Sequence, residues 1–447
     1  MTQLQTRYFS LAALFAFTVF TISAEAQEDW PRFRGASGSG ISSSSAPTQW
    51  GPEKNIQWKT ALPGAGASSP VVVSDKVFLT CYSGYGESRE NVGNKEDLKR
   101  HVVCIDRTTG KELWSKTIAG TANEDDFSGI GVTAHGYASH TPVCDGESLF
   151  VFLGKSGVIA YDLDGKELWK KSVGDGSDSR KWGSASSPIV HDGLLIVPAL
   201  AESRAVYALD KKTGEQVWVC ESDALDNTWA TPMIVNVDDR RSDIVIGVPD
   251  ELWAINSENG KLKWAASGIG DTGFYTSAVE SDGMIYASIG GRSGGGSIAI
   301  RSGGTKDVTD SHVAWNGRTM ASFASPVVYN GHMFVIGRGG VVSVVDIETG
   351  KEVGKSRMQS SDSSRPKSSG GGGRFGSPDY GSPVIAGDKV YYTKGNGETF
   401  VFNADAECKQ IAANKLTDDA EIFPGTPAIS NGQLLIRSNK YLYCIGE

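Results

Sequence analysis

Four residues that could bind a metal ion lie close together in one stretch of the sequence. They are Asp125, Asp126, His135 and His140. Carboxylates and imidazoles are zinc ligands, but these residues follow no fixed ligand spacing, which favours an ordinary polar loop. The run Asp162-Leu163-Asp164-Gly165 resembles the opening of a calcium loop but lacks the final Glu, which favours a hairpin turn. We therefore predict no metal site.

Two common motifs, one of zinc-dependent hydrolysis and one of phosphate binding, are missing from the sequence. HExxH and the P-loop pattern do not occur. The run Gly294-Gly295-Gly296 has no strand-to-helix context, so it does not predict a phosphate-binding loop. The sequence thus favours a binding or scaffolding protein over an enzyme, and we predict no catalytic residue.

Aromatic residues that precede a series of apolar runs form the strongest candidate for a ligand-binding surface. They are Tyr137, Trp182, Trp229, Tyr275, Phe323, Tyr380 and Phe423. Arg180 and Arg374 are expected to lie near them. Aromatic rings with a few charges suit a peptide, an unfolded chain or a sugar. Packing of these rings between structural units is the alternative, and the sequence alone supports both.

The elements that must position these rings form a repeat. Ser/Thr-Pro pairs, each followed by an apolar run, begin at Ser69, Thr141, Ser187, Thr231, Ser325, Ser382 and Thr426, and Thr276-Ser277 fills the gap after the fourth. Within each unit, alternating apolar runs are separated by Asp-Gly and Thr-Gly turns, which is typical of short antiparallel strands. The eight units predict an all-β fold, an eight-bladed β-propeller of four-stranded antiparallel blades.

A tryptophan recurs in the predicted fourth strands and is expected to pack between adjacent blades. The residues at this position are Trp114, Trp169, Trp218 and Trp264. The last unit, from Thr426, lacks a fourth strand, whereas residues 55–59 carry the fourth-strand pattern ahead of the first unit. We predict that this N-terminal strand completes the last blade and closes the ring, which removes an open sheet edge.

The long insertions fall on one face of the predicted propeller. They comprise residues 83–100, 119–140 and 354–381. Loops from second to third strands share a face with the loops that join successive blades, and long loops on a rigid scaffold often carry function. We expect the partner to bind on this face, at the mouth of the central channel.

The run Asp106-Arg107-Thr108-Thr109-Gly110-Lys111-Glu112-Leu113-Trp114 resembles the repeat of PQQ-like β-propellers, and residues 210–218 and 256–264 follow the same pattern. The resemblance extends over about residues 55–447. That superfamily includes quinoprotein dehydrogenases and BamB-type outer-membrane assembly factors. The resemblance therefore implies the propeller fold and two alternatives to a simple binding protein, namely a PQQ-dependent oxidoreductase and a BamB-like assembly factor.

The resemblance also implies what a quinone site would need. Quinoprotein dehydrogenases hold PQQ between a tryptophan and a disulfide of adjacent cysteines, beside a calcium ion bound by Glu, Asn and Asp. The sequence has no Cys-Cys pair and no matching calcium set, so we expect no cofactor. No cysteine follows the N-terminal apolar run, which counts against a lipid-anchored BamB in the strict sense.

The first residues indicate export. Arg7 precedes an apolar stretch over residues 11–22, and Ala24-Glu25-Ala26 forms a small-residue cleavage pattern. We expect a signal peptide (1–26), an N-terminal extension (27–54) and the propeller (55–447), with no transmembrane segment after signal removal and a periplasmic or secreted location. An uncleaved anchor is the alternative, which the short apolar run disfavours.

Charge and cysteine content limit the partners and crosslinks. The net charge of -9, with both signs spread along the chain, excludes a nucleic-acid-coating protein. A protein, a peptide or a carbohydrate is the expected partner. None of the six cysteines forms a CxxC pair. Buried free thiols are favoured, and Cys81 with Cys104 is the most plausible pair if a disulfide forms.

Overall fold

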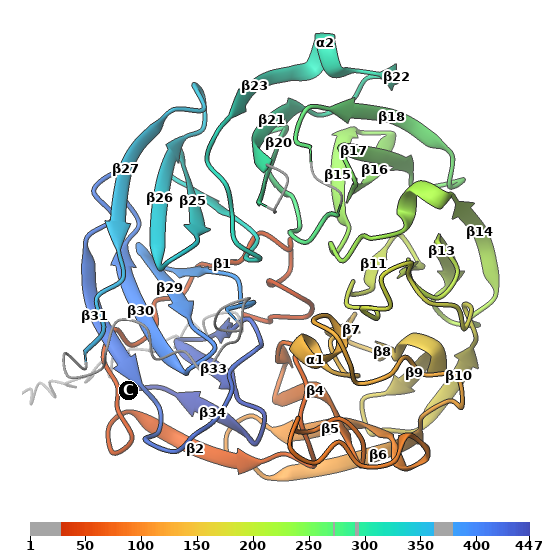
Figure 1. Cartoon of the computed structure of the whole chain (residues 1–447), viewed down its shortest axis with the longest axis vertical. Helices are drawn as coiled ribbons and strands as arrows, with labels where there is room; N and C mark the ends of the chain where they lie inside the picture. Colours follow the sequence, from red (N-terminus) through yellow and green to blue (C-terminus); the bar gives the residue numbers. More distant parts are fainter. Residues whose placement is uncertain (1–27, 271–272, 291–294, 362–378) are drawn as a thin grey trace, which may run out of the picture.

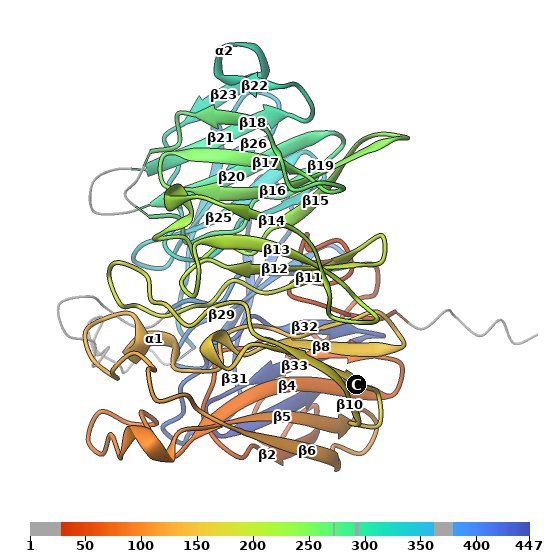
Figure 2. The same ribbon diagram turned by 90° about the vertical axis from the view of Figure 1, so that its right-hand side faces the viewer.

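Eight β-sheets are arranged in a ring around a central axis in the computed structural model (Figure 1). The structure describes residues 28–270, 273–290, 295–361 and 379–447. Seen from the side, the strands of neighbouring blades run next to one another, and the connecting loops project at the two ends (Figure 2). This arrangement confirms the predicted eight-bladed β-propeller.

The first four blades follow one another along the chain. Blade 1 comprises β3 (Val71–Val73), β4 (Lys76–Ser83), β5 (Lys99–Asp106) and β6 (Glu112–Ala119). Blade 2 comprises β7 (Val143–Cys144), β8 (Ser148–Phe152), β9 (Val158–Asp162) and β10 (Glu167–Lys171). Blade 3 comprises β11 (Ile189–His191), β12 (Leu194–Ala199), β13 (Ala205–Asp210) and β14 (Gln216–Glu221). Blade 4 comprises β15 (Met233–Asp238), β16 (Arg241–Val248), β17 (Glu251–Asn256) and β18 (Leu262–Ser267), with β22 (Lys306–Asp307) added at its outer edge.

The other four blades complete the ring. Blade 5 comprises β19 (Val279–Ser281), β20 (Met284–Gly290), β21 (Gly295–Arg301) and β23 (Val313–Gly317). Blade 6 comprises β24 (Val327–Tyr329), β25 (His332–Gly337), β26 (Val341–Asp346) and β27 (Glu352–Arg357). Blade 7 comprises β28 (Val384–Ala386), β29 (Lys389–Thr393), β30 (Glu398–Asn403) and β31 (Gln410–Lys415), joined by β1 (Ile41–Ser42). Blade 8 comprises β32 (Ala428–Ser430), β33 (Gln433–Arg437), β34 (Tyr441–Ile445) and the early strand β2 (Ile56–Ala61).

Helical structure in the described residues is short and lies in connections. The α-helices are α1 (Val132–His135) and α2 (Thr309–His312), and the 3-10 turns are η1 (Lys95–Asp97), η2 (Gly154–Ser156) and η3 (Asp223–Leu225). None of the helices in the described ranges is both long and apolar enough to cross a membrane. The predicted signal peptide, residues 1–26, lies outside these ranges.

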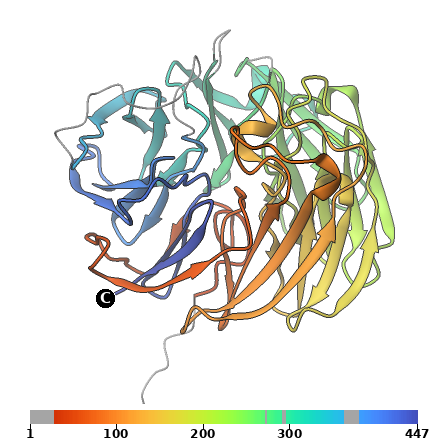
Figure 3. The same cartoon turned by 60° about the horizontal axis from the view of Figure 1, so that its bottom comes forward.

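The ring closes as predicted, because β2 pairs with β34 in an antiparallel register that places Trp58 opposite Cys444. Figure 3 shows this early strand lying against the C-terminal strands. Arg437, fully buried at the end of β33, crosses the same seam and donates from Nη1 to the Thr80 carbonyl (2.8 Å) and the Ser68 hydroxyl (3.1 Å). The first and last parts of the chain are therefore tied together by both strand pairing and a buried guanidinium.

Side-chain hydroxyls at the start of the innermost strands link successive blades from blade 1 to blade 8. We call this set the hydroxyl girdle. It consists of Ser69, Thr141, Ser187, Thr231, Ser277, Ser325, Ser382 and Thr426. In seven successive steps, the backbone N–H of one member donates to the hydroxyl of the next, at 2.9–3.0 Å. The girdle residues are buried, so each hydroxyl satisfies a donor that water cannot reach.

Tryptophans on the outer strands form a second link between blades. Each indole N–H donates to a turn carbonyl of the following blade, and the ring packs on a glycine of that turn. The pairs are Trp58 with Gly110, Trp114 with Gly165, Trp169 with Gly214, Trp218 with Gly260 and Trp315 with Gly350. The sequence analysis did not single out Trp315. Trp264 is buried in the core of blades 4 and 5, and its Nε1 has no acceptor among the described residues.

The cysteines are free thiols. Cys81 and Cys104 do not face each other, because β4 and β5 pair Cys81 with His101 and Cys104 with Phe78. The two side chains enter different core clusters on either side of the blade. The pair is therefore not a disulfide, and Cys220 alone among the six is partly exposed.

The contact between Trp169 and Gly214 yields a prediction on stability. A Cβ added at Gly214, where φ is +72°, would lie 2.6 Å from the Trp169 ring, whereas at Gly193, where φ is +81°, it would meet no atom within 4 Å. We expect Gly193→Ala to lower the free energy of unfolding by about 1 kcal/mol through backbone strain alone. Gly214→Ala should lower it by roughly 1–3 kcal/mol more, because the ring must move. Urea unfolding of the two variants measures the difference. Equal losses of unfolding free energy would contradict a packing contact between Trp169 and Gly214.

Candidate functional site

Long loops gather at one end of the ring, where successive blades are joined. The connection from β6 to β7 carries α1, and the hairpin between β4 and β5 carries η1. Both lie at the same end of the molecule in the side view (Figure 2). We call this end the decorated face, and its side chains form the candidate site.

Five of the predicted aromatic residues form a continuous row, which we call the aromatic arc. It runs in the order Trp182, Trp229, Tyr275, Phe323 and Tyr380, from blade-to-blade loops that follow one another around the ring. Successive ring centroids lie 5.2, 5.3, 5.5 and 5.1 Å apart. All five side chains are partly exposed, and Phe323 is the most exposed at 38%. The arc is therefore a surface that an incoming ligand can reach.

Hydrogen bonds hold one end of the arc in place. The Arg180 guanidinium lies 5.0 Å from the Trp182 ring and donates to the Tyr275 hydroxyl at 3.0 Å. Asp178, which is buried, accepts backbone N–H groups of Arg180, Trp182 and Gly183. Burial nevertheless raises the pKa of the Asp178 carboxyl, and these bonds oppose the rise. The loop that carries Trp182 is thus shaped before any ligand binds.

Two of the seven predicted aromatic residues lie outside the arc. Tyr137 is buried against Tyr82, Tyr85 and Phe127 beneath the decorated loops. Phe423 is 1% exposed and packs on Tyr443. These two rings take the packing role that the sequence had left as the alternative. Arg374 lies outside the described residues.

A cluster of buried ionisable residues adjoins the Trp182 end of the arc, between blades 2 and 3. Arg100 forms a bidentate ion pair with Glu124, at 2.7 and 2.9 Å. His140 Nε2 lies 2.8 Å from the Ser184 hydroxyl, which also interacts with the Glu202 carboxyl. Sequence analysis did not identify this cluster, because its members come from separate strands and loops with no common motif.

Burial shifts the pKa values of Glu202 and His140, the two groups of this cluster without an ion-pair partner among the described residues, in opposite directions. Desolvation raises the pKa of Glu202 to about 7 and lowers the pKa of His140 to about 3, and nearby Arg100 adds to the lowering at His140. Both groups therefore favour their neutral forms in the folded protein. Glu202 Oε2 and His140 Nδ1 have no partner within the described chain, and the cavity they border has a volume of about 30 Å³, enough for a water molecule.

The four residues considered as metal ligands each have other partners. His135 uses both ring nitrogens, one with the Ser139 hydroxyl (2.6 Å) and one with the Trp182 carbonyl (2.8 Å). Asp125 pairs with Lys155 at 3.3 Å, and Asp126 pairs with Lys95. Across the described ranges, His, Cys, Asp and Glu form no group of three that could hold a metal ion.

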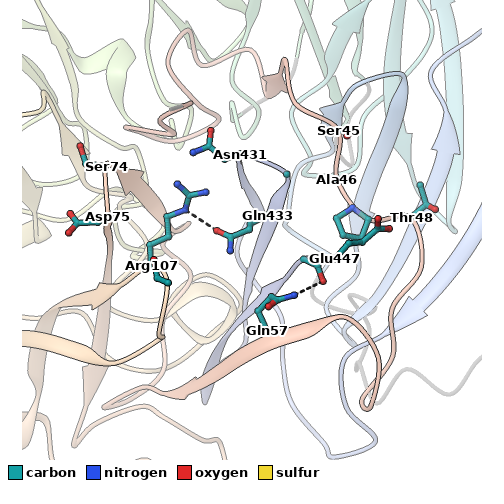
Figure 4. Close-up of a pocket in the computed structure, with 14 residues that line it drawn as sticks. Ser45, Ala46, Thr48, Gln57, Ser74, Asp75, Arg107, Asn431, Gln433 and Glu447 are labelled. Atoms are coloured by element: carbon teal, nitrogen blue, oxygen red, sulfur yellow. Dashed lines mark hydrogen bonds between the residues drawn. The ribbon is translucent and has the colours of Figure 1, made fainter. Parts of the chain in front are cut away.

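A polar cavity with a volume of about 770 Å³ lies at the blade 8 seam, away from the arc (Figure 4). Polar side chains line it. Arg107 donates to Gln433 at 2.9 Å, and Gln57 donates to the Gly446 carbonyl at 2.9 Å. The cavity is bounded by residues 45–48 of the extension and by Glu447. Its lining contains no aromatic ring, so its chemistry differs from that of the arc.

The closed ring of eight blades defines an eight-bladed β-propeller, and the comparisons with known proteins support a relation to the PQQ-like β-propeller family. A family model described as outer membrane protein assembly factor BamB matches residues 98–273. Over 183 residues the chain is 29% identical to the outer membrane protein assembly factor BamB of Burkholderia pseudomallei (strain K96243). That match covers 40% of this chain and 37% of the relative, so it spans little more than a third of that protein.

Solved structures share the fold at low sequence identity. BamB from Moraxella catarrhalis superposes with a TM-score of 0.56 at 12% identity, over 87% of this chain and 98% of the other. Quinohemoprotein alcohol dehydrogenase from Comamonas testosteroni gives 0.59 at 13% identity, over 94% and 81%. At these identities the likeness establishes the fold alone, because the same fold hosts unrelated functions.

The raised pKa of Glu202 yields a prediction on pH dependence. In the unfolded chain its pKa is near 4.5, and in the folded chain it is about 7, so the folded state is progressively destabilised as pH rises from 4.5 to 7. Glu202→Gln should remove this dependence and be more stable than the wild type at pH 8 by up to about 3 kcal/mol, relative to the difference at pH 4.5. Urea unfolding at the two pH values is the measurement. Glu167→Gln, on exposed β10, controls for loss of one charge, and a parallel pH response of wild type and Glu202→Gln would refute the assignment.

Proposed function

We propose that this protein is an exported, non-catalytic propeller that binds a protein or peptide partner at its decorated face. The observation that carries the proposal is the aromatic arc, five partly exposed rings in mutual contact at the channel mouth. Exposed rings of this kind are rare on surfaces that bind nothing and are enriched where proteins bind other chains.

The dimensions of the arc suit an extended chain. The five rings form one elongated row with successive centroids 5.1–5.5 Å apart, which is long enough for several side chains of an extended peptide, since these repeat on one side at roughly 6.5–7 Å. Each ring offers a rigid apolar face at low entropic cost, while Arg180 and the Tyr275 hydroxyl offer polar contacts at one end. A sugar would also stack on such rings, but five consecutive rings favour a longer, flexible ligand.

The relatives support a protein partner more than a redox cofactor. The curated relative is described as outer membrane protein assembly factor BamB, although the match covers only part of that protein. The carboxylates near the arc do not match the Glu, Asn and Asp ligands that hold the calcium ion beside PQQ in quinoprotein dehydrogenases. Asp178, the buried carboxyl closest in sequence to the arc, is occupied by three backbone N–H groups, and no three-residue acidic set exists in the described chain. We derive no reaction from the fold.

Trp229 lies inside the arc and provides the direct test. Binding to an array of 12-residue peptides rich in aromatic and proline residues is measured by fluorescence anisotropy. We expect Trp229→Ala to weaken binding of the tightest peptide at least tenfold, because ring stacking supplies about 1.5 kcal/mol or more. Val217→Ala, which removes a half-exposed apolar side chain from the outer strand β14, is the matched control and should leave binding unchanged. Equal affinity of folded Trp229→Ala and wild type would reject the arc as the binding surface.

A second measurement addresses the oxidoreductase alternative. Purified protein is mixed with PQQ, calcium and an artificial electron-accepting dye, and small alcohols and aldose sugars are supplied as substrates. We expect no cofactor-dependent dye reduction above the rate without protein. Turnover that requires both PQQ and protein would overturn the non-catalytic proposal.

A further inference from the structure

The N-terminal extension carries two arginines into the centre of the ring. Trp30 exchanges two backbone hydrogen bonds with Val72 of blade 1, and β1 pairs with β28 of blade 7. Residues 31–40 therefore cross the ring between these blades, and Figure 1 shows this early segment over the central opening. Arg32 and Arg34 lie on the crossing.

Arg34 is completely buried, with a relative exposure of 0%. Its Nη2 donates to the carbonyls of Ser39 (2.9 Å) and Pro326 (2.5 Å). Its Nε and Nη1 have no acceptor in the described part of the chain. The N–H donors of a buried guanidinium are normally all hydrogen-bonded, so the described protein atoms leave Arg34 without acceptors for two of its nitrogens.

Arg32 is 8% exposed and likewise has free donors. Its Nε donates to the Ala36 carbonyl at 3.1 Å, and neither terminal nitrogen has an acceptor among the described residues. The two terminal nitrogens of a guanidinium form a fork that matches two oxygens of an oxyanion. Burial lowers the pKa of Arg32 to about 10, and burial together with repulsion from Arg32 lowers the pKa of Arg34 to about 9.

No carboxylate of the described chain forms an ion pair with either arginine. Asp29, the nearest acid in sequence among those described, accepts the Ser74 backbone N–H at 2.8 Å, and Glu28 is engaged by Ser42, Ser43 and Ser44. Other buried arginines of this protein are satisfied differently. Arg100 has a bidentate partner in Glu124, and Arg437 uses all three of its nitrogens on neighbouring acceptors. Two adjacent buried cations without an anion are therefore peculiar to the extension.

We propose that Arg32 and Arg34 form a binding site for a small tetrahedral oxyanion, of the phosphate or sulfate class, at the centre of the propeller. The anion neutralises both guanidiniums and accepts the hydrogen bonds that the protein leaves unmade. The surrounding loop is shaped to hold the two side chains. Gly38 and Gly40 adopt φ of +75° and +81°, and an added Cβ would lie 2.4 Å from Arg32 Nη2 and 2.9 Å from Arg34 Nη2.

The test measures the thermal stability and calorimetric binding of the full mature chain with sodium phosphate, sulfate or acetate, each against chloride at equal ionic strength. Phosphate and sulfate should raise Tm by about 2 °C for each tenfold increase above Kd, since a ligand of the folded state stabilises it. The acetate arm separates a tetrahedral oxyanion from a carboxylate such as a peptide C-terminus. A response to acetate as large as that to phosphate, or no difference between phosphate and the chloride reference, would overturn the proposal.

Variants locate the site. Arg32→Gln keeps an N–H donor, now on an amide, but removes the charge, and it should weaken phosphate binding at least tenfold. Arg34→Gln should also weaken phosphate binding at least tenfold if the variant folds. If it does not fold, comparison of the wild type with Arg32→Gln tests the site. Arg107→Gln is the matched control, because Arg107 is equally buried but donates to Gln433 and Ser430 at the seam. Full phosphate binding by Arg32→Gln, or its loss in Arg107→Gln alone, would place the anion elsewhere and refute the assignment.

Discussion

The hydroxyl girdle is the constraint on which the rest of the molecule depends. From blade 1 to blade 7, the girdle residue has a buried N–H that finds its acceptor on the next blade, so each of these blades is tied to the start of its neighbour. An unpaired buried N–H costs about 1–3 kcal/mol, which makes a hydroxyl at each position close to obligatory. Proline follows most girdle residues because it has no N–H of its own to satisfy at the strand start. The girdle also sets where the mouth of the channel lies, since the preceding residues must emerge around it.

The fold could be predicted from the sequence because the girdle residues and the outer-strand tryptophans recur at a regular spacing. The aromatic arc could be predicted only in part. Four of its members, Trp229, Tyr275, Phe323 and Tyr380, stand two residues before a girdle hydroxyl, and this shared offset delivers their rings to one line. Tyr137 and Phe423 stand four and three residues before theirs, and both rings turn into the core. The two-residue offset thus marks four members of the arc, whereas Trp182 stands five residues before Ser187 and joins the row without it. His140, Ser184 and Glu202 carry no such signal, since only the packing of blades 2 and 3 brings them together.

The N-terminal extension packs against blade 7, one of the two blades in which the repeat lacks its tryptophan. Blade 6 has Gly354 at that position, and a Cβ there would lie 1.8 Å from the Ala406 carbonyl, so blade 7 packs too closely for any larger side chain. Blade 7 has no tryptophan in β31, and here Trp50 of the extension stacks on Tyr391 and its backbone N–H donates to Asn414. β1 adds a parallel strand to the same blade. The extension is therefore part of the ring's packing, which explains why it can hold charged side chains at the centre without being displaced.

The buried cluster beside the arc shows how stability and binding are balanced. His135 and Asp178 fix the backbone around Trp182, and the His140–Ser184 contact fixes the residues that follow it. A ring held in place before the ligand arrives loses less conformational entropy on binding. That rigidity has a cost, because a carboxyl such as Glu202 is ionised in water at neutral pH and must be kept close to neutrality here. A purely structural loop would have gained by replacing Glu202 with an apolar residue, since that change removes the penalty. Its presence next to the arc therefore fits the proposed binding role, in which the shape of this end of the surface matters more than the stability it costs.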